Sequence, residues 1–379
     1  MRQFRLSMAG LLLFLNLYCP AQMEKVKDAI LNHVGKRPTC SCDSLWKKAD
    51  ALEFLKLLRR ATSSNASVWP QYSLRDATFI LNAGQVGGQV FCLGLIKGGK
   101  VVSYGQFENT LTMLTPLYSY YLNYKGMDSL PDDLFFHTAK NAGNGFKKWM
   151  DQMGISSAVY MPVVFSTLPF KISPLVKVQI GIHEAFHVEV MLKYWYLKKG
   201  SWPRWDNQPD RKAIQSCYTY HDQDRTIIQK ELAMLADLVE SLLEGKNEKV
   251  CSLGREYLNA RENRYDGLSE VKINKNRDTL IDCRAAEALL ELEEGMADYA
   301  SWTVLFNLRM ASKAQLMGRY RARQDDHFYL SGNMMMHAML LMDKKSEGNL
   351  VNEIVNSADV TKGSLLNIFK MKLNEYCAR

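Results

Sequence analysis

Two histidines and a glutamate stand at metal-site spacing in the segment 182–187, which reads Ile-His-Glu-Ala-Phe-His. On a helix, residues four apart lie about 40° from each other around the axis, so the imidazoles of His183 and His187 can reach one ion. Glu184 points about 100° away from His183, which suits contact with a metal-bound water molecule. Zinc would lower the pKa of that water toward about 7, and the carboxylate would take its proton during attack on a carbonyl group. The competing interpretation is a pair of buried, hydrogen-bonded core histidines; the glutamate between them favours the metal.

A catalytic zinc ion needs a third protein ligand and an open fourth position. Lys193 stands where a third histidine, six residues after His187, would be expected in one known arrangement. We therefore expect the third ligand to be Glu294, one helical turn before Asp298. The glutamate would bind zinc while the aspartate accepts a hydrogen bond from a ligating imidazole and fixes its tautomer. The small residues that follow Glu294 would allow this helix to approach the His183 helix closely.

Other acidic side chains compete for these roles. Glu262 and Asp266 repeat the same spacing, but they stand among arginines at a predicted helix end, where exposure to solvent is the ordinary explanation. Glu287 and Glu291 share a helix face with Glu294 by their spacing. Two interpretations of this pair stay open: a solvated acidic face, or part of a stripe that faces the cleft and holds a substrate amine.

These residues resemble the gluzincin branch of zinc metallopeptidases, which includes thermolysin-like and aminopeptidase-like enzymes. The resemblance rests on His183-Glu184-x-x-His187 and Glu294-x-x-x-Asp298, and on Glu294-Gly295-x-Ala297, which is similar to the third-ligand helix of several such families. It implies a Zn²⁺ ion bound by the two histidines and Glu294. Glu184 would be the base, and Asp298 would accept a hydrogen bond from a ligating imidazole. The separation between the two motifs is longer than in thermolysin-like members, which implies an inserted helical region.

By the same resemblance, a tyrosine or histidine from a later helix would stabilise the oxyanion of the reaction. Tyr329 is the first candidate and His327 the second, with Gly332 permitting close packing nearby. Each could equally be a surface or core residue, whereas His337, among methionines, is expected in the core.

The resemblance predicts a metallopeptidase whose partner is a peptide or protein substrate. Three alternatives stay open: a zinc hydrolase of a non-peptide amide or ester, a catalytically inactive binding protein that retains the fold, and a helical adaptor whose histidines have no metal role.

The elements that must position these residues change in character along the chain. Glycine-separated β-prone runs predict a small antiparallel β-region within 77–106, and another β-prone run at 158–165 precedes the His183 helix. Ser173-Pro174 predicts where that helix begins, because serine caps the first turn and proline lacks only a donor that had no partner. Apolar periodicity predicts further helices at roughly 23–60, 111–150, 174–198, 223–244, 248–264, 279–310, 313–323, 329–343 and 362–376. The expected fold class is α+β, predominantly helical and zincin-like.

Three parts are predicted: a signal peptide over 1–21, an N-terminal helical segment and β-region over 22–172, and a helical catalytic region over 173–379 with both zinc-ligand helices. Arg2 and Arg5 precede an apolar run too short to span a bilayer, which is typical of an export signal. We expect a secreted or periplasmic protein without a membrane span after signal removal. Lipid anchoring at Cys19 is less favoured, because the bulky Tyr18 precedes it.

The composition is that of a soluble globular protein, with 47% hydrophobic and 23% charged residues among 379. The net charge of +8 is spread without a long basic run, so nucleic-acid binding is not expected. Eight cysteines permit disulfides in an exported chain but do not prove them, and Cys92 is expected to be a core residue.

Overall fold

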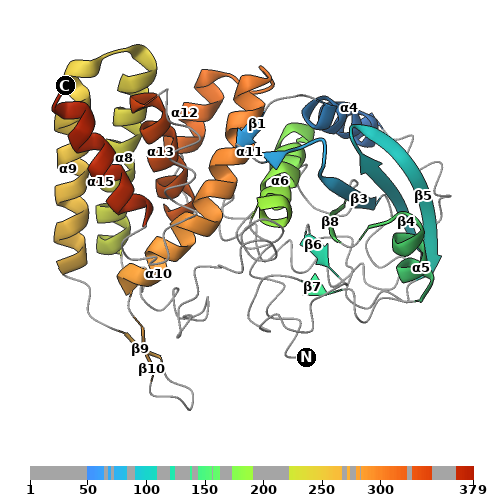
Figure 1. Cartoon of the computed structure of the whole chain (residues 1–379). Coiled ribbons are helices and arrows are strands. Elements are labelled where there is room, and N and C mark those ends of the chain that lie inside the picture. Colours follow the sequence, from blue (N-terminus) through green and yellow to red (C-terminus); the bar gives the residue numbers. More distant parts are fainter. Residues whose placement is uncertain are drawn as a thin grey trace. The chain divides into compact units, whose positions relative to one another are not determined.

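The computed structural model of the chain describes residues 49–63, 67–69, 72–82, 90–108, 120–123, 137–138, 144–155, 157–162, 173–190, 222–266, 271–273, 279–281, 283–321, 327–343 and 364–379. The predicted signal peptide and Cys19 lie outside these residues. Two units, Met1–Lys193 and Tyr194–Arg379, have their own internal packing and are described one at a time. The described residues are mostly helical and include a mixed six-stranded sheet, an α+β fold (Figure 1).

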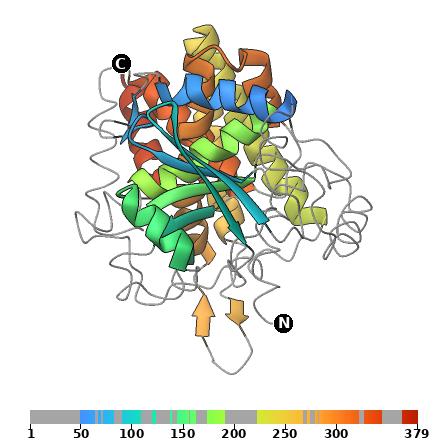
Figure 2. The same ribbon diagram turned by 90° about the vertical axis from the view of Figure 1, so that its right-hand side faces the viewer.

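The first unit is built on a six-stranded sheet in the order β5-β4-β3-β8-β6-β7. Its strands are β3 (Thr78–Asn82), β4 (Val90–Lys97), β5 (Lys100–Glu108), β6 (Tyr120–Asn123), β7 (His137–Thr138) and β8 (Ser157–Pro162). Strands β3, β4 and β5 form an antiparallel meander, as predicted for 77–106, and Figure 2 shows β4 and β5 side by side. Gly98 and Gly99 make the β4–β5 turn with positive φ angles, which glycine adopts without strain.

The rest of the sheet departs from the prediction. Strand β8 pairs with β3 in parallel and β6 pairs with β7 in parallel, so the sheet is mixed rather than antiparallel. The helix predicted over 111–150 is wrong at 120–123 and 137–138, which form β6 and β7. Strand β6 reads Tyr-Tyr-Leu-Asn and pairs antiparallel with β8, and the helix α5 (Asn144–Gln152) occupies the last residues of the predicted segment.

The described residues of the first unit also contain the helices α4 (Ala49–Ser63), α5 and α6 (Pro174–Phe186), and the paired strands β1 (Ser67–Trp69) and β2 (Tyr72–Ser73). Helix α6 packs on β8, β6 and α4. A Cβ atom at Gly181 would stand 2.7 Å from the Met161 sulfur, so the glycine brings α6 close to the sheet. The predicted third part begins at 173, whereas α6 packs here with the β-region of the first unit.

In the part that the structure describes, the second unit contains the helices α8 (Asp222–Glu244), α9 (Asn247–Asp266), α10 (Cys283–Leu290), α11 (Met296–Asn307), α12 (Lys313–Arg321), α13 (His327–Met342) and α15 (Leu365–Cys377), with a hairpin of β9 (Val271–Ile273) and β10 (Thr279–Ile281). Most lie within a few residues of the predicted helices. The exception is 279–310, which begins as a strand and contains the π-helical turn η3 (Glu291–Gly295) between α10 and α11.

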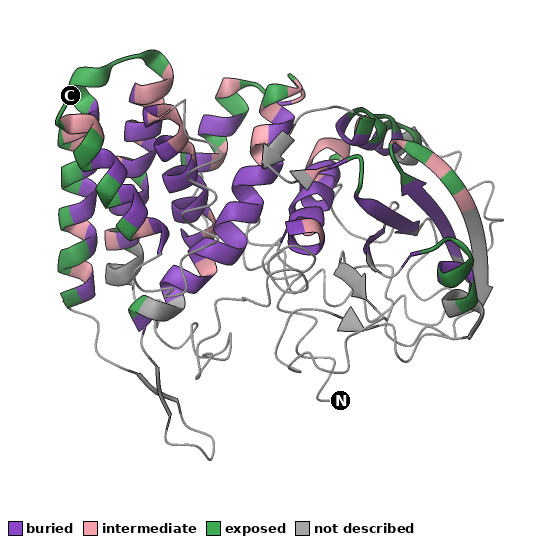
Figure 3. Ribbon diagram, viewed as in Figure 1, coloured by how far each residue is buried: buried purple, intermediate pink, exposed green. Residues whose placement is uncertain are grey.

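Helix α13 is the centre of the second unit. It packs against α8, η3, α11 and α15, and most of its side chains are buried, whereas α9 has an exposed side (Figure 3). A disulfide joins Cys251 of α9 to Cys377 of α15. Cys92, in β4, and Cys283 are disulfide-bonded as well. Among the described residues, no helix combines the length and the apolar character that a bilayer crossing requires.

Candidate metal centre

Helix α6 positions the histidine pair. Its first turn is capped as the sequence predicts: the Ser173 hydroxyl accepts a hydrogen bond from the Val176 amide at 3.3 Å, and Pro174 follows. His183 and His187 are both buried, at 5% and 6% exposure, near the carboxyl end of this helix. The backbone over 187–190 is π-helical rather than α-helical, a departure that is frequent at functional sites.

The two imidazoles converge on one point. The Nε2 atoms of His183 and His187 are 3.2 Å apart, and the ring planes are inclined by 75°. Two nitrogen ligands at about 2.0–2.1 Å from a tetrahedral zinc ion would be roughly 3.3–3.4 Å apart. The pair therefore has the spacing of two ligands of a single ion, as the sequence predicts. With Nε2 as the ligand atom, each ring would carry its proton on Nδ1.

Glu184 is half-buried on the same helix, between two buried neighbours. A carboxylate that keeps some access to solvent is suited to exchange a proton with water. Its part in catalysis stays a prediction.

Glu294 lies in the second unit, in the π-helical turn η3, where it is 5% exposed. Every residue of this turn is buried. A Cβ atom on Gly295 would stand 2.5 Å from the Gly332 Cα of α13, and one on Gly332 would stand 2.5 Å from the Glu291 carbonyl oxygen. The two glycines thus allow η3 and α13 to pack with their backbones in contact. This close packing fixes the position of the Glu294 backbone.

Asp298 follows in the first turn of α11 and is almost fully buried. Its Oδ2 atom accepts a hydrogen bond from the Asn333 side-chain amide at 2.8 Å, and Arg319 approaches its Oδ1 atom to 3.5 Å. Tyr320 donates in turn to the Asn333 carbonyl oxygen at 2.9 Å. Buried polar side chains from α12 and α13 therefore fix the orientation of this carboxylate.

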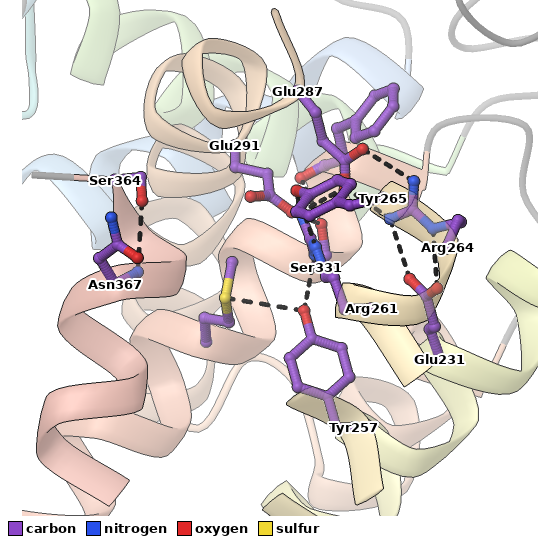
Figure 4. Close-up of polar contacts among 12 residues, drawn as sticks. Glu231, Tyr257, Arg261, Arg264, Tyr265, Glu287, Glu291, Ser331, Ser364 and Asn367 are labelled. Carbon is purple, nitrogen blue, oxygen red and sulfur yellow. Dashed lines mark hydrogen bonds and ion pairs between the residues drawn. The ribbon is translucent and has the colours of Figure 1, made fainter. Parts of the chain in front are cut away.

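A second polar group, which we call the Arg261 cluster, lies between α8, α9, α10, η3 and α13 (Figure 4). It consists of Glu231, Tyr257, Arg261, Arg264, Tyr265, Glu287, Glu291 and Ser331. Arg261 is 1% exposed and forms ion pairs with Glu287 and Glu291. Arg264 contacts Glu287 with both terminal nitrogens, at 2.7 and 2.9 Å, and Glu231 at 2.7 and 2.9 Å.

These contacts correct both interpretations of Glu287 and Glu291. The two carboxylates do not form a solvated acidic face, since they are 1% and 0% exposed. Both are paired with arginines in the interior rather than available to a substrate amine. The competing pair behaves as predicted: Glu262 and Asp266 are exposed and pair with Lys370 and Arg284.

Glu291 is the least compensated member of the cluster. Its Oε1 atom accepts hydrogen bonds from Arg261, at 2.6 Å, and from Ser331. Its Oε2 atom has no hydrogen-bond partner among the described residues. Burial raises the pKa of Glu291 to about 7, because the loss of hydration outweighs the attraction of Arg261 and Glu287 adds repulsion. The cluster contains two arginines and three glutamates, so a proton on Glu291 makes it neutral.

The remaining predicted residues lie on α13. His327 is buried in its first turn, with its ring centroid 3.9 Å from that of Phe328, and Tyr329 is half-buried. Their roles as oxyanion donors stay predictions. The Nδ1 atom of His337 is 3.0 Å from the Tyr320 hydroxyl, and desolvation lowers the pKa of this imidazole to about 4.

The site contains two residues that the sequence did not point to, Asn333 and Tyr320. Neither lies in a recognisable motif, and only tertiary packing brings them to Asp298. The Arg261 cluster did leave a signal: arginines three apart on one predicted helix and glutamates four apart on another are complementary in charge and spacing. Comparison of the chain with protein-family models, curated proteins and solved structures found no match.

Proposed function

We propose that this protein is an exported zinc-dependent metallopeptidase of the gluzincin type, with a zincin-like fold, that hydrolyses peptide bonds. His183, His187 and Glu294 bind the metal ion. The observation that carries the proposal is the pair of buried Nε2 atoms 3.2 Å apart on a helix that also carries Glu184. In the described part of the chain, the two histidines and Glu294 are a group of side chains that could hold a metal ion. Two imidazoles and a carboxylate are the ligand set of thermolysin-type catalytic zinc sites.

The roles of the residues follow from their chemistry. Zinc, when bound, supplies a Lewis acid that lowers the pKa of a water molecule and polarises the substrate carbonyl. Glu184 takes a proton on its carboxylate and passes it to the leaving amine. Asp298 accepts a hydrogen bond from the Nδ1–H of a ligating imidazole, which keeps Nε2 free for the metal. Tyr329, or in its place His327, donates a hydrogen bond to the oxyanion.

Export is supported by the disulfide between Cys251 and Cys377, because disulfides persist in oxidising compartments outside the cytosol. Peptide substrates are proposed through the resemblance of the two motifs to gluzincins. The substrate sequence and the point of cleavage are left to experiment.

The experiment combines metal analysis with a peptide-library digest. We expect the purified wild-type protein to bind one zinc ion and to cleave peptides. Glu184→Gln should keep the zinc and lose about 10²- to 10⁴-fold in activity, because the base is removed and the ligands stay. Glu294→Gln should weaken zinc binding, since a neutral amide is a poor substitute for a carboxylate ligand.

A matched control is Glu262→Gln, which changes the exposed copy of the same Glu-x-x-x-Asp pattern and should leave zinc binding and activity unchanged. A wild-type protein without zinc would refute the metal site. Zinc binding without peptide cleavage would reject the peptidase, and tests with amide and ester substrates would then separate another hydrolase from a binding protein.

A further inference from the structure

The carboxylate of Asp298 stands at one end of a line of polar side chains, which we call the Asp298 chain; all are buried except the half-buried His337. Asn333 contacts Asp298 at 2.8 Å, Tyr320 contacts Asn333 at 2.9 Å, and His337 contacts Tyr320 at 3.0 Å. Asn333 and Tyr320 are 0% and 2% exposed. The members come from α11, α12 and α13, so the chain links three helices behind one carboxylate.

The direction of every hydrogen bond in this chain can be assigned. A carboxylate accepts only, so Asn333 must turn its amide nitrogen toward Asp298 and its carbonyl oxygen toward Tyr320. Tyr320 then has to donate its single proton to Asn333, which leaves its oxygen to accept from His337 Nδ1–H. All donors point the same way, toward Asp298. This order is the same for neutral and charged His337, since Nδ1 carries a proton in both.

A chain of this kind fixes the geometry of its last acceptor. Each hydrogen bond polarises the next, so the amide that reaches Asp298 is a stronger donor than an isolated one. An ionised carboxylate can accept about four hydrogen bonds, so the bonds from Asn333 and Arg319 are compatible with a further N–H donor. The donor that a zinc site supplies is the Nδ1–H of an imidazole whose Nε2 binds the ion.

We propose that Asn333 and Tyr320 are positioning residues of the zinc site, which hold the Asp298 carboxylate in the orientation that accepts Nδ1–H from a metal-binding imidazole. This inference rests on the proposed function. His337 completes the chain by fixing the Tyr320 hydroxyl. The chain acts on the metal only through Asp298, so its loss weakens zinc binding without removing a ligand.

The experiment measures zinc affinity by competition with a chelator for Tyr320→Phe and Asn333→Leu. We expect affinity to fall by about 10- to 100-fold, the usual effect of losing support behind a ligand. The matched control is Tyr257→Phe. Tyr257 is equally buried in the second unit and its hydroxyl accepts from Arg261 at 2.6 Å, but it lies in the Arg261 cluster and not in the Asp298 chain. This variant should bind zinc as the wild-type protein does.

A second measurement replaces zinc with Co²⁺, whose visible absorption reports the geometry of its ligands. The spectrum should change in Tyr320→Phe and stay the same in Tyr257→Phe. If the wild-type protein bound zinc and Tyr320→Phe matched it in affinity and spectrum, the inference would be overturned while the proposed function stood. A wild-type protein that binds no zinc would overturn both. If Asn333→Leu does not fold, Tyr320→Phe is sufficient for the test, because this substitution removes only a single oxygen atom.

Discussion

The Arg261 cluster and the Asp298 chain are both buried polar groups at the contact of α13 with the segment from α10 to α11, yet they are built differently. The cluster is built around full charges that meet in ion pairs, and Arg264 makes two contacts each with Glu287 and Glu231. The chain is made mainly of neutral groups, and its hydrogen bonds all point to a single carboxylate. The cluster carboxylates Glu287 and Glu291 precede Glu294 in the sequence, and Asp298, at the end of the chain of hydrogen bonds, follows it.

The difference teaches what each arrangement is suited to. Buried charges are costly unless every partner is present, so the cluster fixes the position of η3 but does not tolerate the loss of a charged member. Neutral hydrogen bonds contribute little net stability and cost little to bury, so the chain can orient Asp298 without holding the fold together. We therefore expect substitutions in the cluster to act on stability and substitutions in the chain to act on the metal site.

The largest effect is expected from Arg261→Met, which leaves Glu287 and Glu291 as buried carboxylates with less compensation. Removing one partner of a buried ion pair typically costs about 3–5 kcal/mol, so the free energy of unfolding should fall by that amount. Urea unfolding followed by circular dichroism would measure it. A loss below about 1 kcal/mol would mean that the cluster is not an anchor. Adding Glu291→Gln to Arg261→Met should restore part of the stability, because one of the two carboxylates then becomes neutral.

The next effect depends on pH and concerns Glu291. In the folded protein Glu291 keeps its proton up to about pH 7, because its pKa is raised to about 7. A carboxyl group with the ordinary pKa of 4.5 loses its proton at a lower pH. Stability from this group is thus complete below pH 4.5 and decreases as the pH rises to about 7, by at most about 3 kcal/mol at roughly 1.4 kcal/mol per unit. In Glu291→Gln this decrease should be absent. Unfolding of both proteins across pH 4.5–8 would show it, and parallel curves would contradict the assigned proton.

Gly332→Ala tests the contact that both groups need. Its Cβ atom would meet the backbone of η3, so the helices must separate, and overpacking of this kind costs about 1–3 kcal/mol. Gly318→Ala, in α12, is the matched control. It meets nothing within 4 Å and should gain about 0.5–1 kcal/mol through helix propensity. Thermal unfolding of the two variants should therefore shift in opposite directions, and equal shifts would argue against close packing of η3 on α13.

The smallest change in stability is expected for Tyr320→Phe. It removes two neutral hydrogen bonds of the Asp298 chain, the one to Asn333 and the one from His337, worth together about 1–2 kcal/mol. We expect Tyr320→Phe to lose little unfolding free energy and yet to bind zinc more weakly, whereas Arg261→Met should lose much more unfolding free energy. A loss of the size expected for Arg261→Met would show that the chain, too, holds the fold together.

Local signals in the sequence predicted much of the second unit and the start of α6. The Ser173-Pro174 cap and the apolar period of the later helices depend on neighbours in sequence. Strand pairing depends on distant residues, which is why β6 was missed and why the parallel contact of β3 with β8 was not foreseen. The π-helical turn was missed for a similar reason, because it is stabilised by its packing on Gly332.

The candidate site divides in the same way. The convergence of His183 and His187 follows from a spacing of four on a helix, and the structure confirms it. The burial of Glu287 and Glu291 could not be read from their own helix, because the arginines that neutralise them come from α9. Sequence spacing thus predicts which side chains share a face, but not what that face meets.

The turn over 291–295 makes the length of this segment as important as its composition. A π-helical turn contains one residue more than the α-helical turn it replaces, so it takes up that residue without turning the helix that follows. If the same residues were wound as a regular α-helix instead, everything after them would be rotated by about 100° relative to α10. Asp298 would point away from Asn333 while Glu287 still faced Arg264. The π-helical turn therefore allows one continuous helical segment to direct Glu287 toward Arg264 and Asp298 toward the Asn333 amide.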